Sequence, residues 1–463
     1  MTDFSSFCPL LTPWIATQRW FSGKGRHGQP TRIELLDPFP DTAACNTNAG
    51  DRLQIRPAIA TISYLDGQTE YYHIPLAFTR QRPDQFIGFH DDSNSYVSDA
   101  LTQPTLDAFV AGFTHPFTTD TWQIIHSTSA QTWVEPHPTC RLFPGQQSNS
   151  SVLVGSSAVV KIFRKLELGP NLDIEVSHAL TGAGIDAIPT LFGRQQATID
   201  TRNGSATVDL AMISELCNQA TNGWDYMVDR LNRGVDSATD AAAIGRQLAR
   251  VHHGLARCYG TSSGSGDEVA DLMTARLVEA ATQVEALAEW VTPVTRIFDS
   301  IRSTTIQVQR LHGDFHLGQT MKSSRGWMII DFEGEPMKSM AERTRPDSVC
   351  RDLAGMIRSF HYAQVSATRG NPSSCDESAG PTHPAPTGPR PEHPCPASSS
   401  PADAFLAAYC AESGVTLAEV NRLLQAYLAD KAIYEVCYEQ RNRPDWIEIP
   451  LSAIHTLFKS DNV

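Results

Sequence analysis

The sequence lacks the features that mark several large classes of protein. No apolar run approaches the roughly 20 residues that a membrane-spanning helix needs. The first residues, MTDFSSFCPLLTPW, lack the basic and apolar regions of an export signal. The ten cysteines are scattered, with no CxxC pair and no cysteine–histidine cluster at zinc-ligand spacing. We therefore expect a cytoplasmic protein with reduced thiols and no structural zinc.

Positive charge is also scarce. Lysine and arginine number 37 against 51 aspartates and glutamates, which gives a net charge of −14. This balance argues against nucleic acid or an anionic membrane surface as the main partner. It leaves room for ATP, which needs only a local cluster of donors and a metal ion. At 463 residues, 41% of them hydrophobic, the chain can bury a large core and is expected to form two or three domains.

Residues 1–88 have the pattern of a separate N-terminal α/β domain. An amphipathic helix is predicted across LTPWIATQRWFSGKG, carrying Trp14 and Trp20 and ending at Gly23. Two strands follow, ATISYL and EYYHIPLAF, and the DG pair between them is a strong hairpin signal.

The rest of the chain divides into a strand-rich and a helical region. Residues 89–217 are expected to contain a helix near LTQPTLDAFVAGFT, several strands and a helix over DIEVSHALTGAG. Residues 218–463 are mainly helical. In AAAIGRQLARVHHGLAR, helical spacing puts four apolar residues on one face: Ile244, Leu248, Val251 and Leu255.

Residues 371–401 are dense in proline and serine and nearly free of large apolar side chains. Such a segment cannot bury enough surface to offset its ordering entropy. We expect a disordered insertion between two helices of one domain, because helical periodicity resumes at ADAFLAAYCAES. A linker between domains is the alternative.

The string HGDFHLGQT, from His312 to Thr320, carries the strongest chemical signal. Phosphoryl transfer from ATP needs a carboxylate to accept the acceptor's proton and Mg²⁺ to neutralise the phosphates. Asp314, an amide at Gln319 and Asp331 in IIDFEGEP follow the order found in kinase-type folds. Glu333 lies two residues further along and is a further metal ligand candidate.

Other interpretations of this string are weaker. His312 and His316 fit hydrogen-bonded structural histidines of the catalytic loop better than proton shuttles. A metal-dependent hydrolase site is conceivable from HGDFH, but no further His/Asp pair recurs at usable spacing. The kinase interpretation requires an upstream lysine paired with a helical glutamate, and Lys161 in AVVKIFRK with Glu175 in NLDIE supplies them. The alternative is a solvent-facing Lys161.

The phosphate-binding loop lacks both common glycine motifs. GxxxxGK[ST] is absent, which excludes a Walker-type loop, and so is GxGxxG. The polar segment GQQSNSSVLVG, just before the strand of Lys161, can cradle phosphate with backbone, hydroxyl and amide donors; ordinary turn chemistry explains the same letters. Its candidate donors are Gln147, Ser148, Asn149, Ser150 and Ser151. The run LAMISEL is a candidate hinge strand for adenine, ending in Glu215 and Leu216.

The C-terminal segment DKAIYEVCYEQRNRPDW contains two pairs at helical spacing. Tyr434 with Tyr438, and Glu435 with Glu439, each share a helical face. Aromatic rings beside carboxylates suit a sugar, whose apolar face stacks while its hydroxyls are accepted. The alternative is an amphipathic helix with its tyrosines in the core and its glutamates in water.

Taken together, the motifs resemble those of actinobacterial maltokinases, which are related to aminoglycoside phosphotransferases within the protein-kinase-like superfamily. The resemblance covers almost the whole chain, from WIATQRWFSGKG through QSNSSV, VVKIFRK, NLDIE and HGDFHLGQT to YEVCYEQRNRPDW. It implies an α+β, two-lobed kinase-like fold with an N-terminal α/β cap domain. The insertion at 371–401 departs from the expected pattern, and we interpret it as tolerated.

The resemblance also implies a function. It is the ATP- and Mg²⁺-dependent phosphorylation of maltose at its anomeric hydroxyl, giving maltose 1-phosphate for α-glucan synthesis in the cytoplasm. Asp314 is then the catalytic base, and Lys161 binds phosphate. Gln319 and Asp331, with Glu333, hold the metal. The sugar pocket is expected to include His316, Tyr434, Glu435, Tyr438, Glu439 and Arg441. Asp352 is expected to tie the catalytic loop to the helical lobe.

Partners beyond these substrates are not encoded in the sequence. Any association with trehalose synthase would be between separate chains, and we expect a monomer. Two other functions fit the same motifs: a kinase for glucosamine, an aminoglycoside or another small alcohol, and a non-catalytic kinase-like scaffold. The scaffold is disfavoured because Lys161, Asp314 and Asp331 are all retained.

Overall fold

The chain forms two compact units in the computed structural model. The first contains the described residues up to His178 together with Pro189–Asn218, and the second contains Ala179–Ile188 and the described residues from Gln219 on. Both sides of the expected boundary at residue 88 belong to the first unit, so the three-domain division stays a prediction. The structure describes residues 7–26, 28–40, 53–91, 93–127, 138–144, 149–335, 338–369 and 400–459.

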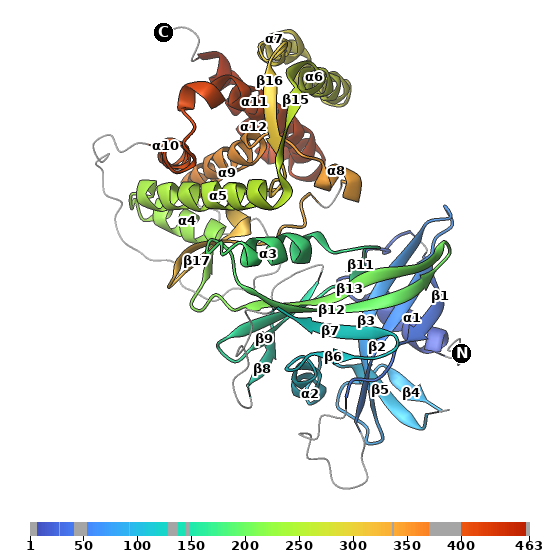
Figure 1. Ribbon diagram of the computed structural model, residues 1–463. Coiled ribbons are helices and arrows are strands. Elements are labelled where there is room, and N and C mark those ends of the chain that lie inside the picture. The colour runs from blue at the N-terminus through green and yellow to red at the C-terminus, as the bar shows by residue number, and fades with distance from the viewer. Residues whose placement is uncertain are drawn as a thin grey trace. The chain divides into compact units, whose positions relative to one another are not determined.

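The first unit contains an N-terminal antiparallel sheet in the order β1-β2-β3-β5-β4, with β11 beside β3 (Figure 1). The hairpin predicted at Asp66-Gly67 is confirmed, because it joins β2 to β3 and Gly67 has a φ of +82°. The strands are β1 (Gln29–Leu35), β2 (Gln54–Ser63), β3 (Thr69–Thr79), β4 (Gly88–His90), β5 (Ser95–Asp99) and β11 (Lys165–Leu166).

Helix α1 (Cys8–Thr17) packs on this sheet through Leu11 and Ile15, which are fully buried. The predicted helix end at Gly23 is wrong. Gln18 has extended backbone with a ψ of 140°, and its N–H bonds to the carbonyl of Ile15 to close the last turn. Trp20 therefore lies beyond the helix.

A second, seven-stranded sheet completes the first unit in the order β6-β7-β12-β13-β10-β9-β8. β12 and β13 are the long green strands of Figure 1. Alternate residues of β10, including Val160 and Ile162, are buried in the core of this unit, as expected for a strand with one covered face. The elements are α2 (Thr105–Ala111), β6 (Phe117–Thr118), β7 (Trp122–His126), β8 (Cys140–Leu142), β9 (Ser150–Val154), β10 (Ala158–Ile162), α3 (Leu172–Gly182), β12 (Leu191–Thr201) and β13 (Gly204–Glu215).

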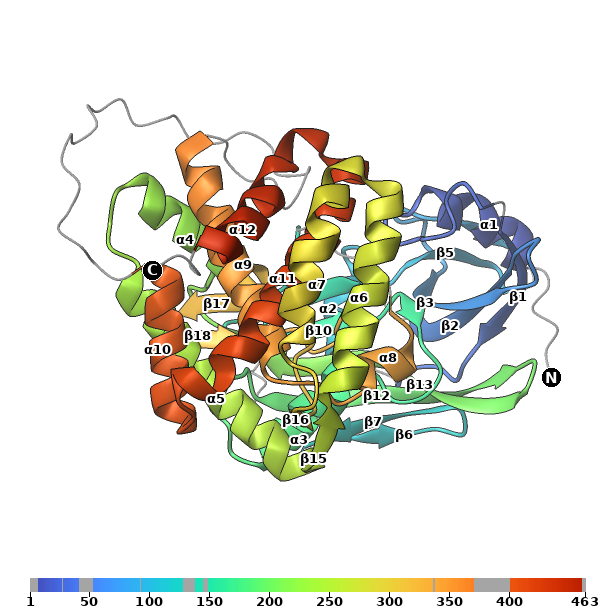
Figure 2. The ribbon, with the colours of Figure 1, turned by 90° about the horizontal axis from the view of Figure 1, so that it is seen from above.

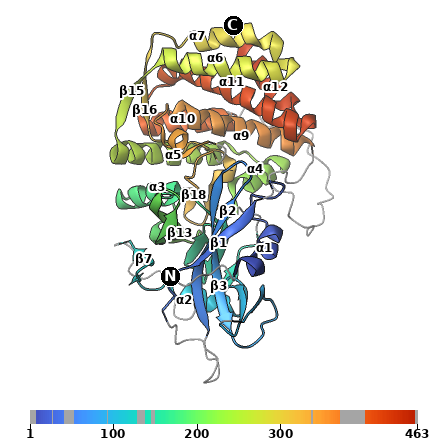
Figure 3. The same cartoon turned by 90° about the vertical axis from the view of Figure 1, so that its right-hand side faces the viewer.

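The second unit is mainly helical. Helices α5, α9 and α10 lie side by side (Figure 3), and α6, α7 and α11 form a neighbouring group (Figure 2). Its helices are α4 (Gly223–Asn232), α5 (Ala238–Tyr259), α6 (Gly266–Gln283), α7 (Val291–Asp299), α8 (Met340–Thr344), α9 (Cys350–Arg369), α10 (Pro401–Ser413), α11 (Leu417–Asn442) and α12 (Glu448–Lys459). Its strands are β14 (Thr221–Asn222), β15 (Thr261–Ser265), β16 (Thr305–Gln309), β17 (Thr320–Ser323) and β18 (Gly326–Ile329).

Helix α5 confirms the predicted apolar face, whose four residues are fully buried. The predicted insertion separates α9 from α10, and its residues 371–399 lie outside the described residues. Its expected end was two residues late, because Ser400 caps α10 and Pro401 is the first helical residue. None of the described helices has the length and hydropathy that a membrane span requires.

Candidate active site

A buried carboxylate on α9 holds the loop that contains Asp314. Asp352 Oδ2 accepts the backbone N–H of His312 and Oδ1 accepts that of Gly313, both at 2.9 Å. Burial alone would raise the pKa of Asp352, but its hydrogen bond and charge interaction with His252 outweigh burial and lower it. The role expected for Asp352, tying the loop to the helical unit, is confirmed.

His312 connects the two halves of the HGDFH…IIDFEG constellation. Its Nδ1 accepts the N–H of Asp314 at 3.4 Å, so the ring proton is on Nε2, which donates to the carbonyl of Ile330 at 3.0 Å. Ile330 immediately precedes Asp331. The imidazole therefore fixes the spacing between the two aspartates, and the structural role predicted for His312 is confirmed.

Gln319 and Asp331 are brought together by backbone pairing. Gln319 lies in the 3₁₀ turn η3 (Leu317–Gln319), and its carbonyl accepts the N–H of Ile330 at 3.0 Å. The strand β18 then ends, and the chain turns at Asp331, whose φ of +67° is rare for a residue other than glycine. Such strained backbone is frequent where a side chain is held for function.

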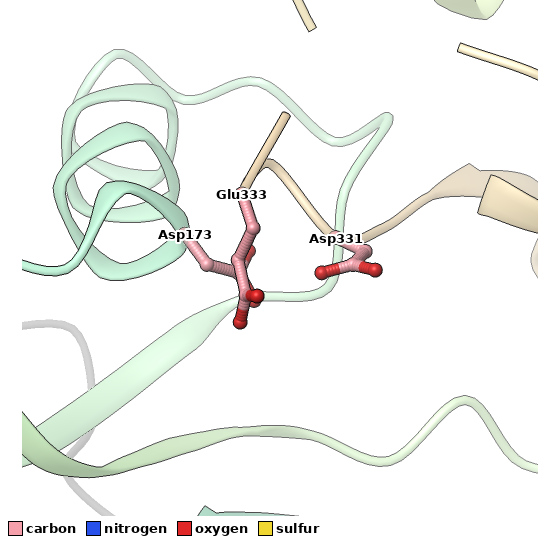
Figure 4. A group of neighbouring side chains, drawn as sticks. All are labelled: Asp173, Asp331 and Glu333. Atoms are coloured by element: carbon pink, nitrogen blue, oxygen red, sulfur yellow. The ribbon is translucent and has the colours of Figure 1, made fainter. Parts of the chain in front are cut away.

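Asp331 and Glu333 point their carboxylates into a common region on the segment that follows β18 (Figure 4). One carboxylate oxygen of each lies within 4.8 Å of the other. Two carboxylates at this spacing offer the hard oxygen ligands that Mg²⁺ prefers. The donor set therefore fits a magnesium ion, which would neutralise phosphate charge when bound.

Asp314 lies beside His316, with 3.9 Å between Asp314 Oδ2 and His316 Nε2. His316 Nδ1 accepts the N–H of Gly318 at 3.0 Å, which caps η3. Burial lowers the pKa of His316, and the charges of Asp314, Lys431 and Asp331 all act on it as well. The charges of the loop aspartate Asp314 and of Asp331 thus both favour the protonated imidazole. A direct sugar contact by His316 stays a prediction.

Lys161 forms its ion pair with an acid from the first turn of the following helix. Its Nζ lies 2.9 Å from Oδ2 of Asp173, which is at the start of α3 (Figure 4). Asp173 and the predicted partner Glu175 are both acidic residues of that turn. The sequence analysis predicted an acidic partner in this helical turn but did not name Asp173. The pairing of Lys161 with Glu175 stays a prediction.

The predicted phosphate loop is described only at its C-terminal end, because Gln147 and Ser148 lie outside the described residues. Asn149 Oδ1 accepts the backbone N–H of Arg164 at 3.3 Å, and Ser150 Oγ accepts from Arg164 Nε at 2.9 Å. Ser151 is buried in β9. These contacts hold the end of the turn beside the strand of Lys161.

The predicted hinge lies at the end of β13. The N–H of Glu215 donates to the carbonyl of Thr190, and that of Leu216 donates to the carbonyl of Ser157, both at 2.9 Å. The Glu215 carboxylate accepts the Thr190 hydroxyl at 3.1 Å. Adenine contacts at this pair, which stay a prediction, would therefore use backbone carbonyls.

The burial of side chains on helix α11 contradicts the alternative interpretation, in which the tyrosines are in the core and the glutamates face water. Tyr434 and Tyr438 are 50% and 45% exposed, whereas Glu435 and Glu439 are buried. Helical spacing identified the two faces correctly but not which one is buried. The exposed rings stay available for stacking against a sugar.

Both glutamates of α11 have basic partners. Arg358 Nη2 lies 2.7 Å from the carboxylate of Glu435, and Arg443 Nη2 lies 2.7 Å from that of Glu439. Tyr362 also donates to Glu439 at 3.0 Å. These pairs anchor the helix, so the predicted sugar contacts of Glu435 and Glu439 would have to share their oxygens. Arg441, also predicted to bind sugar, donates to Gln283 on α6.

Sequence reasoning missed Lys431, one helical turn before Glu435. Its Nζ lies 5.2 Å from the ring centroid of Tyr434. Burial alone would lower the pKa of Lys431, but the charges of Asp314 and Glu335 outweigh burial and raise it. The charge of the ammonium is therefore stabilised by Asp314 and Glu335. The motif DKAIYE contains this lysine beside the predicted sugar-binding residues, but a lysine on a helix is ordinarily solvated, so its burial was not predicted.

Glu335 was also missed, although it stands in the same IIDFEGEP string. Its carboxylate lies 3.0 Å from Arg351 and 2.9 Å from Lys338. Burial would raise its pKa, but the positive charges of Lys431 and Arg351 outweigh burial and lower it. Glu335 thus interacts with three cations, Lys338, Arg351 and Lys431.

No protein-family profile matches the chain. Among curated proteins it is 28% identical over 333 residues to a glucosamine kinase of Streptacidiphilus jiangxiensis, covering 66% of this chain and 70% of that one. It is 25% identical over 251 residues to a glucosamine kinase of Mycolicibacterium smegmatis, covering 48% of this chain and 59% of that one.

A solved glucosamine kinase in complex with glucosamine, ADP and inorganic phosphate aligns with a TM-score of 0.64 at 20% identity. The alignment covers 96% of this chain and 98% of that one. The predicted α+β, protein-kinase-like fold is thereby confirmed. The sequence similarities support a phosphotransferase acting on sugars, and the narrower resemblance to maltokinases stays a prediction.

Proposed function

We propose that the chain transfers the γ-phosphoryl group of ATP to a hydroxyl of a small sugar. The observation that carries this proposal is the connection that His312 makes between Asp314 and Ile330, the residue before Asp331, on a loop whose backbone Asp352 fixes. Phosphoryl transfer depends mainly on positioning and on charge neutralisation, and this arrangement supplies both.

Each residue has a chemical part in the proposed reaction. Asp314 orients the sugar hydroxyl and accepts its proton. Gln319, Asp331 and Glu333 would hold Mg²⁺, which neutralises the transferring phosphates when bound. Lys161, oriented by Asp173, binds phosphate oxygens.

Glucosamine is the first acceptor to test. Both curated relatives described above are glucosamine kinases, and the similarity to one of them spans two thirds of this chain. A protonated amino group also suits a site rich in carboxylates, of which Asp314 and Glu335 face the region of Lys431.

Maltose is the second acceptor, with its anomeric hydroxyl as the phosphorylated position. The motifs from HGDFHLGQT to YEVCYEQRNRPDW support it, as do the half-exposed rings of Tyr434 and Tyr438, which suit the apolar face of a neutral sugar. The product, maltose 1-phosphate, would feed α-glucan synthesis, and a separate trehalose synthase chain would then be a natural partner.

Phosphorus NMR of reactions with Mg²⁺-ATP and either sugar tests the proposal, because it reports the acceptor and the phosphorylated position together. Transfer to glucosamine alone would remove the maltose assignment, and transfer to maltose alone would remove the glucosamine assignment. Asp314→Asn is expected to lower kcat by roughly 100-fold or more while Mg²⁺-ATP still binds. ATP binding without transfer to any sugar of a broad panel would instead support a non-catalytic scaffold.

A further inference from the structure

The chain crosses from one sheet of the first unit to the other at Arg164. β10, which carries Lys161, ends at Ile162 in the second sheet, and β11 begins at Lys165 in the N-terminal sheet. The carbonyl of Arg164 accepts the N–H of His73 on β3 at 2.8 Å. The backbone at Arg164 therefore belongs to both sheets.

The side chain of Arg164 joins the same two sheets. It is only 2% exposed. Its Nη2 donates to Asp99 Oδ2 at the end of β5, at 2.8 Å, and its Nε donates to Ser150 Oγ at the start of β9, at 2.9 Å. One planar guanidinium thus contacts the N-terminal sheet on one side and the predicted phosphate-binding turn on the other.

Both ends of this connection are themselves fixed. Asp99 Oδ1 accepts the N–H of Leu101 at 3.0 Å, which sets the carboxylate orientation. The ring centroid of Trp20, which follows α1, lies 5.1 Å from the Arg164 guanidinium carbon. At the other end, the backbone N–H of Arg164 donates to Asn149 Oδ1.

We propose that Arg164 is a positioning residue through which Asp99 of the N-terminal sheet fixes the phosphate-binding turn at Asn149 and Ser150. The inference rests on the proposed function, since it assumes that this turn holds the phosphates of ATP. It gives the N-terminal sheet a task in the reaction that its distance in sequence from the catalytic loop does not suggest.

The hydrogen-bond directions support this role. A serine hydroxyl has one donor and two acceptor sites, so Ser150, which accepts from Arg164, can still donate its own proton to a phosphate oxygen. The Arg164 fork is rigid and planar, which fixes the direction of Nε once Nη2 is held by Asp99. A buried ion pair of this kind adds little net stability after its desolvation cost, but it does define geometry.

Adjacent Lys165 offers a matched control. Lys165 Nζ pairs with Glu70 of β3 at 2.7 Å, so this ion pair lies within the N-terminal sheet, and its side chain is 46% exposed. Lys165→Met therefore removes an ion pair of the neighbouring residue without removing a contact to the second sheet or to Ser150. If Arg164 has a purely structural role, substitutions at Arg164 and Lys165 will differ in thermal stability but not in KM for ATP.

The test measures KM for ATP, KM for the sugar and kcat in Asp99→Asn, Arg164→Lys and Lys165→Met, with thermal unfolding of each. Asp99→Asn and Arg164→Lys are expected to raise KM for ATP by roughly fivefold or more and to leave KM for the sugar within about twofold. Lys165→Met is expected to leave both KM values unchanged. A raised KM for both substrates in step with lost stability would overturn the inference.

A double-mutant cycle makes the test independent of folding losses. In a Ser150→Ala background the side-chain hydrogen bond from Arg164 to the turn is already lost, so Asp99→Asn is expected to raise KM for ATP by less than it does in the wild-type chain. Additive effects of the two substitutions would overturn the inference.

Calorimetric binding of Mg²⁺-ATP without sugar separates this inference from the proposed function. If the wild-type chain binds ATP but phosphorylates no sugar, the proposed function fails, and weaker ATP binding by Asp99→Asn still supports the role of Arg164. If the wild-type chain phosphorylates a sugar and Asp99→Asn binds ATP with unchanged affinity, the inference alone fails.

Discussion

The imidazole of His252 on α5 lies between two buried groups, with Nε2 3.0 Å from Asp352 Oδ2 and Nδ1 2.9 Å from the hydroxyl of Tyr409 on α10. The same Asp352 oxygen accepts the N–H of His312 in the catalytic loop. If the tyrosine donates to Nδ1, Nε2 carries the ring proton that Asp352 accepts. Tyr409 thereby helps to orient the carboxylate that fixes the loop.

Tyr409→Phe is expected to lower the free energy of unfolding by about 1 kcal/mol, because His252 Nδ1 loses its buried partner. We also expect kcat to fall several-fold while both KM values change little, since the loop loses part of its support rather than a substrate contact. Urea unfolding and steady-state kinetics measure the two effects.

Tyr226→Phe is the control for this prediction. Tyr226 donates to Asp240 at 3.3 Å on other elements of the same unit, so its loss is expected to cost a similar stability without changing kcat. Equal kcat losses in the two variants would show that stability alone, and not the orientation of Asp352, limits turnover.

The candidate site residues could be predicted from the sequence because most of them lie in short sequence motifs. Asp314 and Gln319 lie five residues apart in one loop, and Asp331 follows the next hairpin, so their order in the fold depends on few long-range contacts. The same holds for the hairpin at Gly67, where a single glycine supplies the positive φ.

What the sequence could not provide is the pairing of residues far apart in the chain. The burial of Glu435 depends on Arg358, which lies 77 positions away, and helical periodicity contains no information on that partner. Lys431 was missed for the same reason, since its importance comes from Asp314 on a distant loop. Arg164 reads as an ordinary basic residue at a strand end until Asp99 is placed beside it.

Gly245 lies where α5 packs tightly against α10. A Cβ at this position would lie 2.2 Å from the backbone carbonyl oxygen of Phe405, which cannot move without shifting α10. Gly245→Ala is therefore expected to destabilise the chain by about 1–3 kcal/mol despite the better helix propensity of alanine. Gly182→Ala at the end of α3 meets nothing within 4 Å and should be neutral or slightly stabilising in the same urea experiment.

Lys431 is expected to affect catalysis more than folding. Lys431→Met removes a positive charge beside Asp314 and Glu335, so the acids repel one another and the developing phosphate charge loses a cation. We expect kcat/KM to fall by roughly 10- to 100-fold. Lys431→Arg keeps the charge and should recover part of this loss. Equal losses of kcat/KM in both variants would show that the size and shape of the lysine side chain matter, and not its charge.

The charge of the acceptor sharpens this experiment. A protonated amino sugar is repelled by Lys431, so Lys431→Met is expected to raise KM less for glucosamine than for maltose. Equal changes in KM for the two sugars would show that the Lys431 ammonium lies away from the amino group of bound glucosamine.

Acid is expected to destabilise the first unit through His73, which is fully buried in β3. Burial, aided by the positive charge of Arg164, lowers the pKa of His73 to about 3 from 6.5. The unfolded chain therefore binds the proton first as the pH falls, so stability is complete above pH 6.5 and declines below it. The expected slope is about 1.4 kcal/mol per pH unit down to about pH 3. Urea unfolding of His73→Leu should show a shallower decline, and parallel curves would contradict this assignment.

Asp331 combines a proposed metal-ligand role with a left-handed backbone conformation, and two substitutions separate the two properties. Asp331→Ala and Asp331→Gly both remove the carboxylate, so both are expected to lose Mg²⁺-dependent transfer. At a φ of +67° alanine keeps the strain and glycine relieves it. Asp331→Gly is therefore expected to be more stable than Asp331→Ala by about 1 kcal/mol.

Glu333 gives the reference for this comparison because its φ is not positive. There Glu333→Gly should be less stable than Glu333→Ala, the usual order for a residue without backbone strain. If the glycine variant is the weaker one at both positions, the left-handed turn at Asp331 stores no strain.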